Sequence, residues 1–180
     1  MHSRKRRISP ARAIALVGIS AATVECGKLA LAAIPNVEVV TLLLALYGYA
    51  FGYLGVAAAL VFVAIEPMIY GFGSWVVSYM IYWPLVAVVF MLLGRARIKN
   101  RLLLTAVAVC LTFFFGVLSS LVDIGLFSGF FDNFFARFAI YYARGVPFYA
   151  AQIITNAVMF PLLFPFLAER LGRIFRRQKG

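Results

Sequence analysis

Long apolar runs dominate the sequence and limit what the chain can fold into. Of its 180 residues, 64% are hydrophobic and 13% are charged, and the mean hydropathy is +0.98. A soluble domain of this size cannot bury so much apolar surface, so the composition predicts an integral membrane protein. The alternating strands of about ten residues that form membrane barrels are missing, which favours a bundle of transmembrane helices.

Turn signals and charged segments divide the apolar sequence into six runs, each suited to a helix in a bilayer. Pro35 ends the first run, and glycine-containing segments at 52–55 and 71–74 separate the next ones. The predicted spans cover residues 11–33, 37–52, 55–72, 75–93, 102–127 and 146–168. The alternative for the first run is a cleavable signal peptide, because Ala30-Leu31-Ala32 resembles a cleavage site. We expect an all-α membrane protein with one transmembrane domain of six helices over residues 1–180.

Of the 17 basic residues, 14 lie in three groups, at 4–12, 95–101 and 170–179. Six spans place all three groups on one side of the membrane, whereas five or seven would separate the two tails. Because basic loops favour the cytoplasmic side, the pattern predicts a multi-pass protein of the cell membrane with both termini in the cytoplasm. Basic loops that face anionic lipid also explain the net charge of +11, so nucleic acid is not expected as a partner.

The sequence contains no residue arrangement typical of a metal centre or an enzyme. Cys26 and Cys110 both lie in apolar runs, and the single histidine, His2, lies in a basic tail. No G-x-x-x-x-G-K-[ST] motif is present, so ATP hydrolysis is expected in partner proteins. Since no nucleophile–base pair is evident either, we predict no catalytic residue, metal or cofactor.

Polar side chains gather in the half of each predicted span that lies farthest from the basic groups, and the other half is almost purely apolar. Polar groups that several helices place at one level predict a common ligand pocket, open to the outside. Glu66 lies inside an otherwise apolar helix and is the strongest candidate for such a site. The candidate binding residues are Glu25, Lys28, Asn36, Glu38, Thr41, Glu66, Tyr70, Trp75, Tyr79, Asp123, Gln152 and Asn156.

Structural roles remain open for several of these residues. Glu25 and Lys28 are three residues apart on one helix, where they would neutralise each other. Glu38 stands at the amino end of the second span, where a carboxylate stabilises a helix. The tyrosines and tryptophans of the fourth span would suit an interfacial belt. The two amides of the sixth span would suit hydrogen bonds between helices.

Charge and aromatic content narrow the expected ligand. Four carboxylates face one lysine at the polar level, so a neutral or cationic, donor-rich ligand is favoured over a polyanion, and the aromatic rings suit stacking on a flat ring. Residues 128–145 are aromatic and mixed in charge, and we predict a loop there that acts as an extracellular lid or lies on the membrane surface. Arg137 and Arg144 in this segment would alter the charge balance if the lid closes over the site.

Small residues recur on the first span. Ala11 and Ala15 are four residues apart, and Gly18 or Ile19 continues the same face. Such a face allows another helix to approach closely, either a helix of a partner protein or one of this bundle.

These features resemble the substrate-binding S-components of energy-coupling factor (ECF) transporters. The resemblance covers almost the whole chain. The segments that open the second span and close the third span resemble a vitamin-carrier subgroup. It rests on six short helices, the basic amino terminus, Ala11-x-x-x-Ala15, the segment Pro35-Asn36-Val37-Glu38-x-x-Thr41, and Glu66 with Tyr70-Gly71-Phe72-Gly73.

The resemblance implies a binding subunit that captures a vitamin or related micronutrient from outside. It also implies that Ala11 and Ala15 contact a transmembrane coupling protein that carries two ATPase subunits, and that the S-component topples in the membrane to deliver its ligand. The loop before the second span and residues 128–145 would be parts of a lid. Cobalamin, thiamine-like and other neutral or cationic vitamins fit the charge balance better than biotin or folate.

Two other functions remain open. A stand-alone secondary transporter of a nucleobase-like or vitamin precursor would need a coupling-ion site, for which Glu66 and Asp123 are the candidates. A membrane scaffold with the fold of an S-component would need no carboxylate-lined pocket.

Overall fold

The computed structural model describes residues 8–34 and 37–178, and every regular element in these ranges is a helix. Five of the six helices are long and apolar enough to cross a bilayer. The exception is α2, whose 12 residues extend about 18 Å, less than the hydrocarbon core of about 30 Å. The helices are α1 (Pro10–Ala30), α2 (Val40–Phe51), α3 (Tyr53–Tyr70), α4 (Ser74–Arg95), α5 (Arg101–Phe127) and α6 (Phe134–Gln178).

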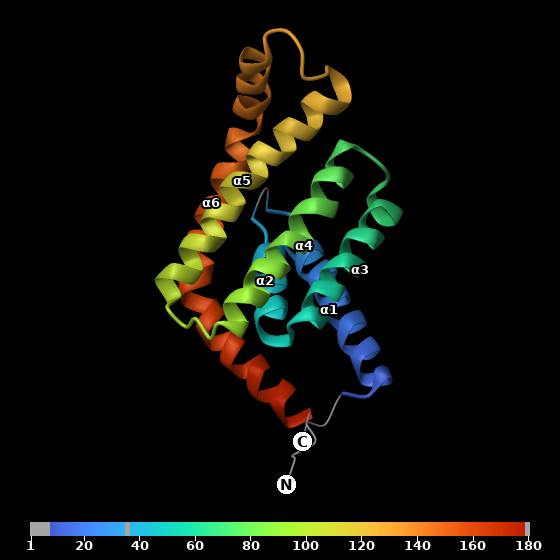
Figure 1. Ribbon diagram of the computed structural model, residues 1–180, viewed down its shortest axis with the longest axis vertical. Helices are drawn as coiled ribbons and strands as arrows, with labels where there is room; N and C mark the ends of the chain where they lie inside the picture. Colours follow the sequence, from blue (N-terminus) through green and yellow to red (C-terminus); the bar gives the residue numbers. More distant parts are fainter. Residues whose placement is uncertain (1–7, 35–36, 179–180) are drawn as a thin grey trace.

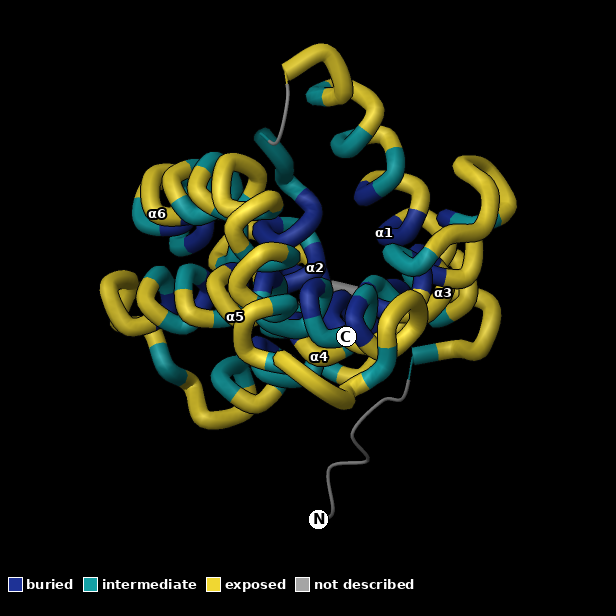
Figure 2. Tube along the Cα trace, turned by 90° about the horizontal axis from the view of Figure 1, so that it is seen from above, coloured by how far each residue is buried: buried dark blue, intermediate teal, exposed yellow. Residues whose placement is uncertain are grey.

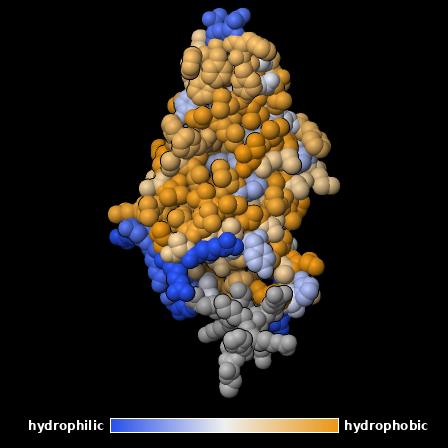
Figure 3. Space-filling model, viewed as in Figure 1, coloured by the Kyte–Doolittle hydropathy of each residue, from blue (hydrophilic) through white to orange (hydrophobic). Residues whose placement is uncertain are grey.

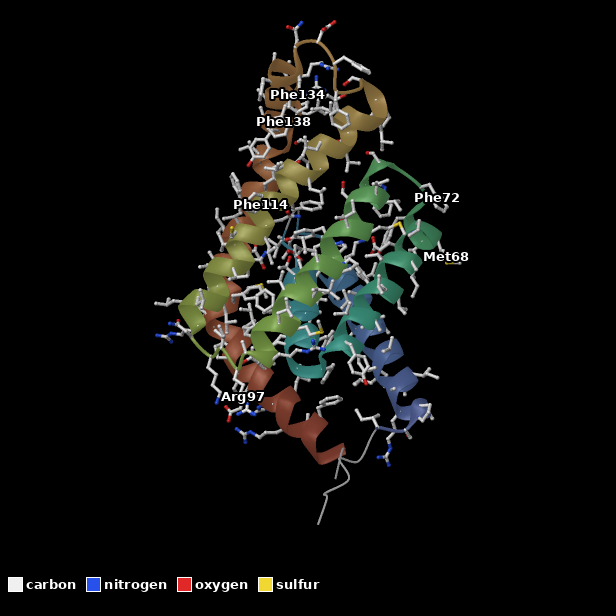
Figure 4. The ribbon with its side chains drawn as sticks, viewed as in Figure 1. Met68, Phe72, Arg97, Phe114, Phe134 and Phe138 are labelled. Carbon is white, nitrogen blue, oxygen red and sulfur yellow. The ribbon has the colours of Figure 1, made fainter. Side chains whose placement is uncertain are left out.

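Successive helices run in opposite directions along the bundle (Figure 1). The beginning of α1, the α2–α3 turn, the α4–α5 loop and the carboxyl end of α6 lie at one end of the molecule, which we call the basic end. Arg97 marks this end in Figure 4, and hydrophilic side chains gather there in Figure 3. The arrangement brings the described members of the three basic groups to one end, as the sequence predicts, whereas Lys28, Arg137 and Arg144 lie away from it. The side of the membrane on which they lie, and the number of spans, stay predictions.

Local sequence explains where the helices begin and end. The Ser9 hydroxyl accepts a hydrogen bond from the Arg12 amide at the start of α1 (3.4 Å), and the Asn100 side chain caps α5 through the amides of Leu102 and Leu103 (2.9 and 3.2 Å). Gly52, with φ of +66°, forms the tight turn between α2 and α3. The predicted helix boundaries in this part of the chain are therefore close to the observed ones.

The sixth helix differs most from the prediction. Residues 128–133 form the connection, but the rest of the predicted loop over 128–145 is helical, because α6 begins at Phe134. Phe134, Phe138 and Tyr142 lie four residues apart and stack successively, with ring centroids 6.1 and 5.9 Å apart. The aromatic content of residues 128–145 favours an irregular segment, whereas the four-residue spacing of these three rings is that of one helical face. Whether this segment acts as a lid stays a prediction.

Helix α2 lies at the centre of the bundle, where Figure 2 shows it mostly in the colour of buried residues. Nine of its residues are buried, and it packs against α3, α4 and α6. Neighbouring helices therefore surround α2 where lipid would surround an outer helix, which explains how so short a helix is accommodated. The outer surface is apolar (Figure 3), with Met68, Phe72 and Phe114 directed outward (Figure 4).

Gly48 allows α2 to approach α4 closely. A Cβ atom at this position would collide with the carbonyl group of Ala87. We expect Gly48→Ala to lower the free energy of unfolding by about 1–3 kcal/mol, because the backbones must separate. The matched control is Gly18→Ala on α1, where a Cβ atom meets nothing within 4 Å. Unfolding midpoints of the detergent-purified proteins test this, and equal midpoints for the two variants would contradict it.

Candidate functional site

The buried charge of α3 is paired with a lysine from α1. Lys28 Nζ contacts both carboxylate oxygens of Glu66, at 2.6 Å and 2.5 Å. The Glu66 side chain is 1% exposed and that of Lys28 is 26% exposed. The lysine ammonium also lies 3.9 Å from the centre of the Tyr70 ring, a cation–π distance. A carboxylate inside an apolar helix thus has the partner that its burial requires.

Glu25 of α1 belongs to the same group of side chains, through a hydrogen bond with Tyr70 of α3. Its Oε1 atom accepts a hydrogen bond of 2.6 Å from the Tyr70 hydroxyl, and its Oε2 atom is buried with no hydrogen-bond partner among the described residues. The alternative predicted an ion pair between Glu25 and Lys28 on α1. In the structure, Lys28 pairs with Glu66 of α3 instead. We call Glu25, Lys28, Glu66 and Tyr70 the α1–α3 cluster.

A second polar group surrounds Glu38. Its Oε2 atom accepts from the Thr41 amide (2.9 Å) and its Oε1 atom accepts from the Thr41 hydroxyl (2.6 Å). Asn156 of α6 donates through Nδ2 to Glu38 Oε1 (3.3 Å) and to Thr112 Oγ1 of α5 (3.0 Å). Glu38 therefore does stabilise the start of α2, and Asn156 does join helices, as the structural alternatives predict. We call Glu38, Thr41, Thr112 and Asn156 the Glu38 cluster.

Aromatic rings of α4 extend from the α1–α3 cluster toward α5. The Tyr79 ring lies 5.8 Å from Lys28 Nζ and packs edge-to-face on Trp75 and Trp83, with centroids 5.1 and 5.4 Å away. The ring centroids of Tyr82 and of Phe115 on α5 are 4.7 Å apart. Trp75 and Tyr79 were predicted as binding residues, and the structure places them in a ring network inside the bundle that also contacts other helices.

Two predicted residues are not joined to these clusters. The side chains of Asp123 and Gln152 form no hydrogen bond or ion pair within the described ranges. The predicted binding residue Asn36 lies outside those ranges. Ala11 and Ala15 are both exposed on α1, so their small-residue face does not pack against the part of the chain that the structure describes.

Sequence reasoning missed Thr112, which is 1% exposed and central to the Glu38 cluster. A signal was available, because a buried face repeats every four residues along α5 and Thr112 is its first polar member. This face consists of Leu104, Ala108, Thr112, Gly116, Ser120 and Ile124. Tyr82 was placed at the polar level of the fourth span but not among the binding residues, although its hydroxyl is buried beside the side chains of Thr41 and Thr112.

The two clusters together contain three carboxylates and one ammonium group, which leaves an excess of negative charge. Such a site can accept hydrogen bonds from a neutral or cationic ligand and repels anions. A separate groove of about 290 Å³ lies between α4 and α5, lined by apolar side chains of both helices and by Tyr82. Its lining suits lipid and differs from the polar pocket that the sequence predicts.

Comparisons with known proteins give no match: no family model, no curated protein and no solved structure matches the chain.

The Lys28–Glu66 pair can be tested with a double-mutant cycle. Lys28→Met should lower the free energy of unfolding by about 2–3 kcal/mol, a buried-pair value reduced for the exposed part of the lysine, because Glu66 loses its counter-charge. Lys28→Met with Glu66→Met should recover much of that loss, since no unpaired charge remains.

The exposed pair Glu169–Arg173 is the matched control, with a distance of 2.6 Å and side chains 64% and 62% exposed. Removing either partner should change stability by less than about 0.5 kcal/mol. A Lys28→Met effect no larger than this one, measured by unfolding in detergent, would show that the buried pair contributes little.

Proposed function

We propose that this protein is the membrane-embedded binding subunit of an ECF-type transporter, which captures a vitamin or related micronutrient from outside. The observation that carries the proposal is the α1–α3 cluster, in which a fully buried glutamate is held by a lysine of another helix. Charged groups inside a membrane bundle are costly and usually serve binding or transport. The proposal combines this cluster with the resemblance of the sequence motifs to S-components, because the comparisons add no relative.

The position of the clusters fits capture from outside. Lys28 and Glu66 lie near the ends of α1 and α3 farthest from the basic end, and Glu38 lies just before α2 at the same end of the molecule. If the basic end faces the cytoplasm, these groups lie toward the external side. The excess of carboxylates supports a neutral or cationic vitamin, with cobalamin and thiamine-like compounds as candidates.

The first helix offers a surface for a partner. Ala11 and Ala15 are exposed, and a Cβ atom at Gly18 would meet nothing within 4 Å. A face of small side chains lets a second helix pack closely in lipid. We assign it to the transmembrane coupling protein, which would bring two ATPase subunits to a chain that has no nucleotide motif of its own.

The second candidate, a stand-alone secondary transporter, loses its proposed coupling-ion site of two carboxylates. Glu66 is bonded to Lys28, and Asp123 makes no polar contact with it in the described ranges. A coupling ion would need another site. The third candidate, a scaffold, does not account for a buried charged cluster.

Ligand retention tests the binding function. We expect mass spectrometry of the purified protein to find a bound micronutrient, and Glu66→Gln to lower its occupancy about tenfold or more, because the carboxylate that pairs with Lys28 is lost. Asp123→Asn is the matched control and should retain the ligand. Occupancy is counted per folded molecule, and an unchanged value in Glu66→Gln would remove Glu66 from the site.

Partner binding tests the role of α1. Ala15→Trp should abolish co-purification of a coupling protein and ATPase subunits from native membranes, because the large ring prevents close helix approach. Leu60→Trp, at an exposed apolar position of α3, should leave the complex intact. Equal recovery of the ATPase subunits with both variants would place the docking surface elsewhere.

A further inference from the structure

Among the three carboxyl groups of the two clusters, that of Glu25 has the fewest hydrogen-bond donors. Its Oε1 atom accepts from the Tyr70 hydroxyl (2.6 Å), and its Oε2 atom is buried with no hydrogen-bond partner among the described residues. By contrast, three donors reach Glu38, and the Lys28 ammonium group reaches both oxygens of Glu66. An ionised carboxyl group can only accept hydrogen bonds, so a buried oxygen that no donor reaches is costly.

The neighbour of Glu25 across the contact between α1 and α3 is another acid. The carboxyl group of Glu66 lies within hydrogen-bond reach of the Glu25 side chain, and the Glu66 side chain is 1% exposed. Two adjacent carboxylates repel each other, and in apolar surroundings such a pair usually keeps one proton. Lys28 neutralises one of the two acids, and the described residues form no ion pair with Glu25. With both acids ionised, one negative charge would have no partner.

The other groups that face this pair in the described helices do not supply a second positive charge. Tyr79 of α4 lies near both acids, with its ring 5.8 Å from Lys28 Nζ. Tyr70 of α3 already donates its hydroxyl proton to Glu25. Glu38, just before α2, is a further acid, and its oxygens are bonded within its own cluster. The surroundings of the pair therefore offer one ammonium group, two phenols and a third carboxyl group.

We propose that Glu25 and Glu66 form a proton-binding site, in which one proton is held between their carboxyl groups at neutral pH. The proton lies on Glu25 Oε2 and is donated to Glu66, so the acceptor without a partner becomes a donor with an acceptor beside it. One carboxylate then remains for one ammonium group, and the α1–α3 cluster carries no net charge. A cluster without net charge is much less costly inside a membrane bundle than one with a spare negative charge.

The proton site goes beyond the proposed binding function, because the pair holds its proton whether or not a micronutrient is bound. With all carboxyl groups ionised, the two clusters carry three negative charges and one positive charge, and the proton removes one of the negative charges. A cationic ligand that bonds to Glu25 must displace this proton and release it to the medium, whereas a neutral ligand leaves it in place. Only this last step rests on the proposed function.

Infrared spectroscopy of the protein, purified in a maltoside detergent at neutral pH, tests the site. A protonated carboxyl group absorbs apart from an ionised one, and its band moves to lower frequency in D₂O. The chain has only six acidic side chains, so single substitutions can assign the band. We expect a protonated-carboxyl band in the native protein and its loss in both Glu25→Gln and Glu66→Gln. In Glu25→Gln the new amide can still donate to Glu66, so the thermal unfolding midpoint should stay close to the native value.

Asp123→Asn is the matched control, because the Asp123 side chain forms no hydrogen bond or ion pair within the described ranges. This variant should keep the band. A native protein without a protonated-carboxyl band overturns the proposal in favour of a buried water at Glu25 Oε2. A band that survives in Glu25→Gln or in Glu66→Gln also overturns it, because the proton is then not shared by the pair. Micronutrient occupancy, measured by mass spectrometry, tests the proposed function separately, so either idea can fail alone.

Discussion

The ion pair between Lys28 and Glu66 is the contact on which the arrangement of the outer helices depends. Helix α1 buries only Ser20, Ala21 and Val24, so apolar packing alone holds it weakly against the bundle. The Lys28–Glu66 pair, together with the Glu25–Tyr70 hydrogen bond, fixes α1 to α3 at one level. In lipid there is little hydrophobic drive between helices, and such polar contacts set their positions. The rest of α1 stays free to offer its small-residue face outward.

The interior is organised differently on the other side of the bundle. There α2 is surrounded by protein, and glycines allow backbones to touch where side chains would hold them apart. Rings of Phe90, Phe160 and Phe164 fill the space toward the basic end, with centroids 5.4–5.6 Å apart. The Glu38 cluster lies at the opposite end of α2, where this helix begins. The bundle therefore has a densely packed apolar half and a half in which hydrogen bonds and charges determine the contacts.

Much of this organisation follows from sequence rules, and the rest depends on how helices face one another. Glycine marked the ends of α2 and α3 well, since it acts through local backbone geometry. The position of Glu66 in an apolar run implied a partner for its charge. That this partner is Lys28, and not a residue of α3 itself, follows only from the packing of α1 on α3. Thr112 was missed because a hydroxyl in an apolar helix can satisfy itself on its own backbone. Asp123 was included for its charge and its level in the fifth span. The residues next to it in the sequence do not show that its side chain lies outside both clusters.

One guanidinium group has a mechanical consequence for the far end of the molecule. Arg137 donates to the carbonyl oxygens of Ser128 and Phe131, at 2.8 and 2.9 Å, and so ties the first turns of α6 to the connection from α5. These two hydrogen bonds hold the tip of the α5–α6 hairpin closed. At the other end of α6, the Phe175 ring packs on Phe51, the last residue of α2. Helix α6 therefore connects the hairpin tip with the α2–α3 turn, across the full height of the bundle.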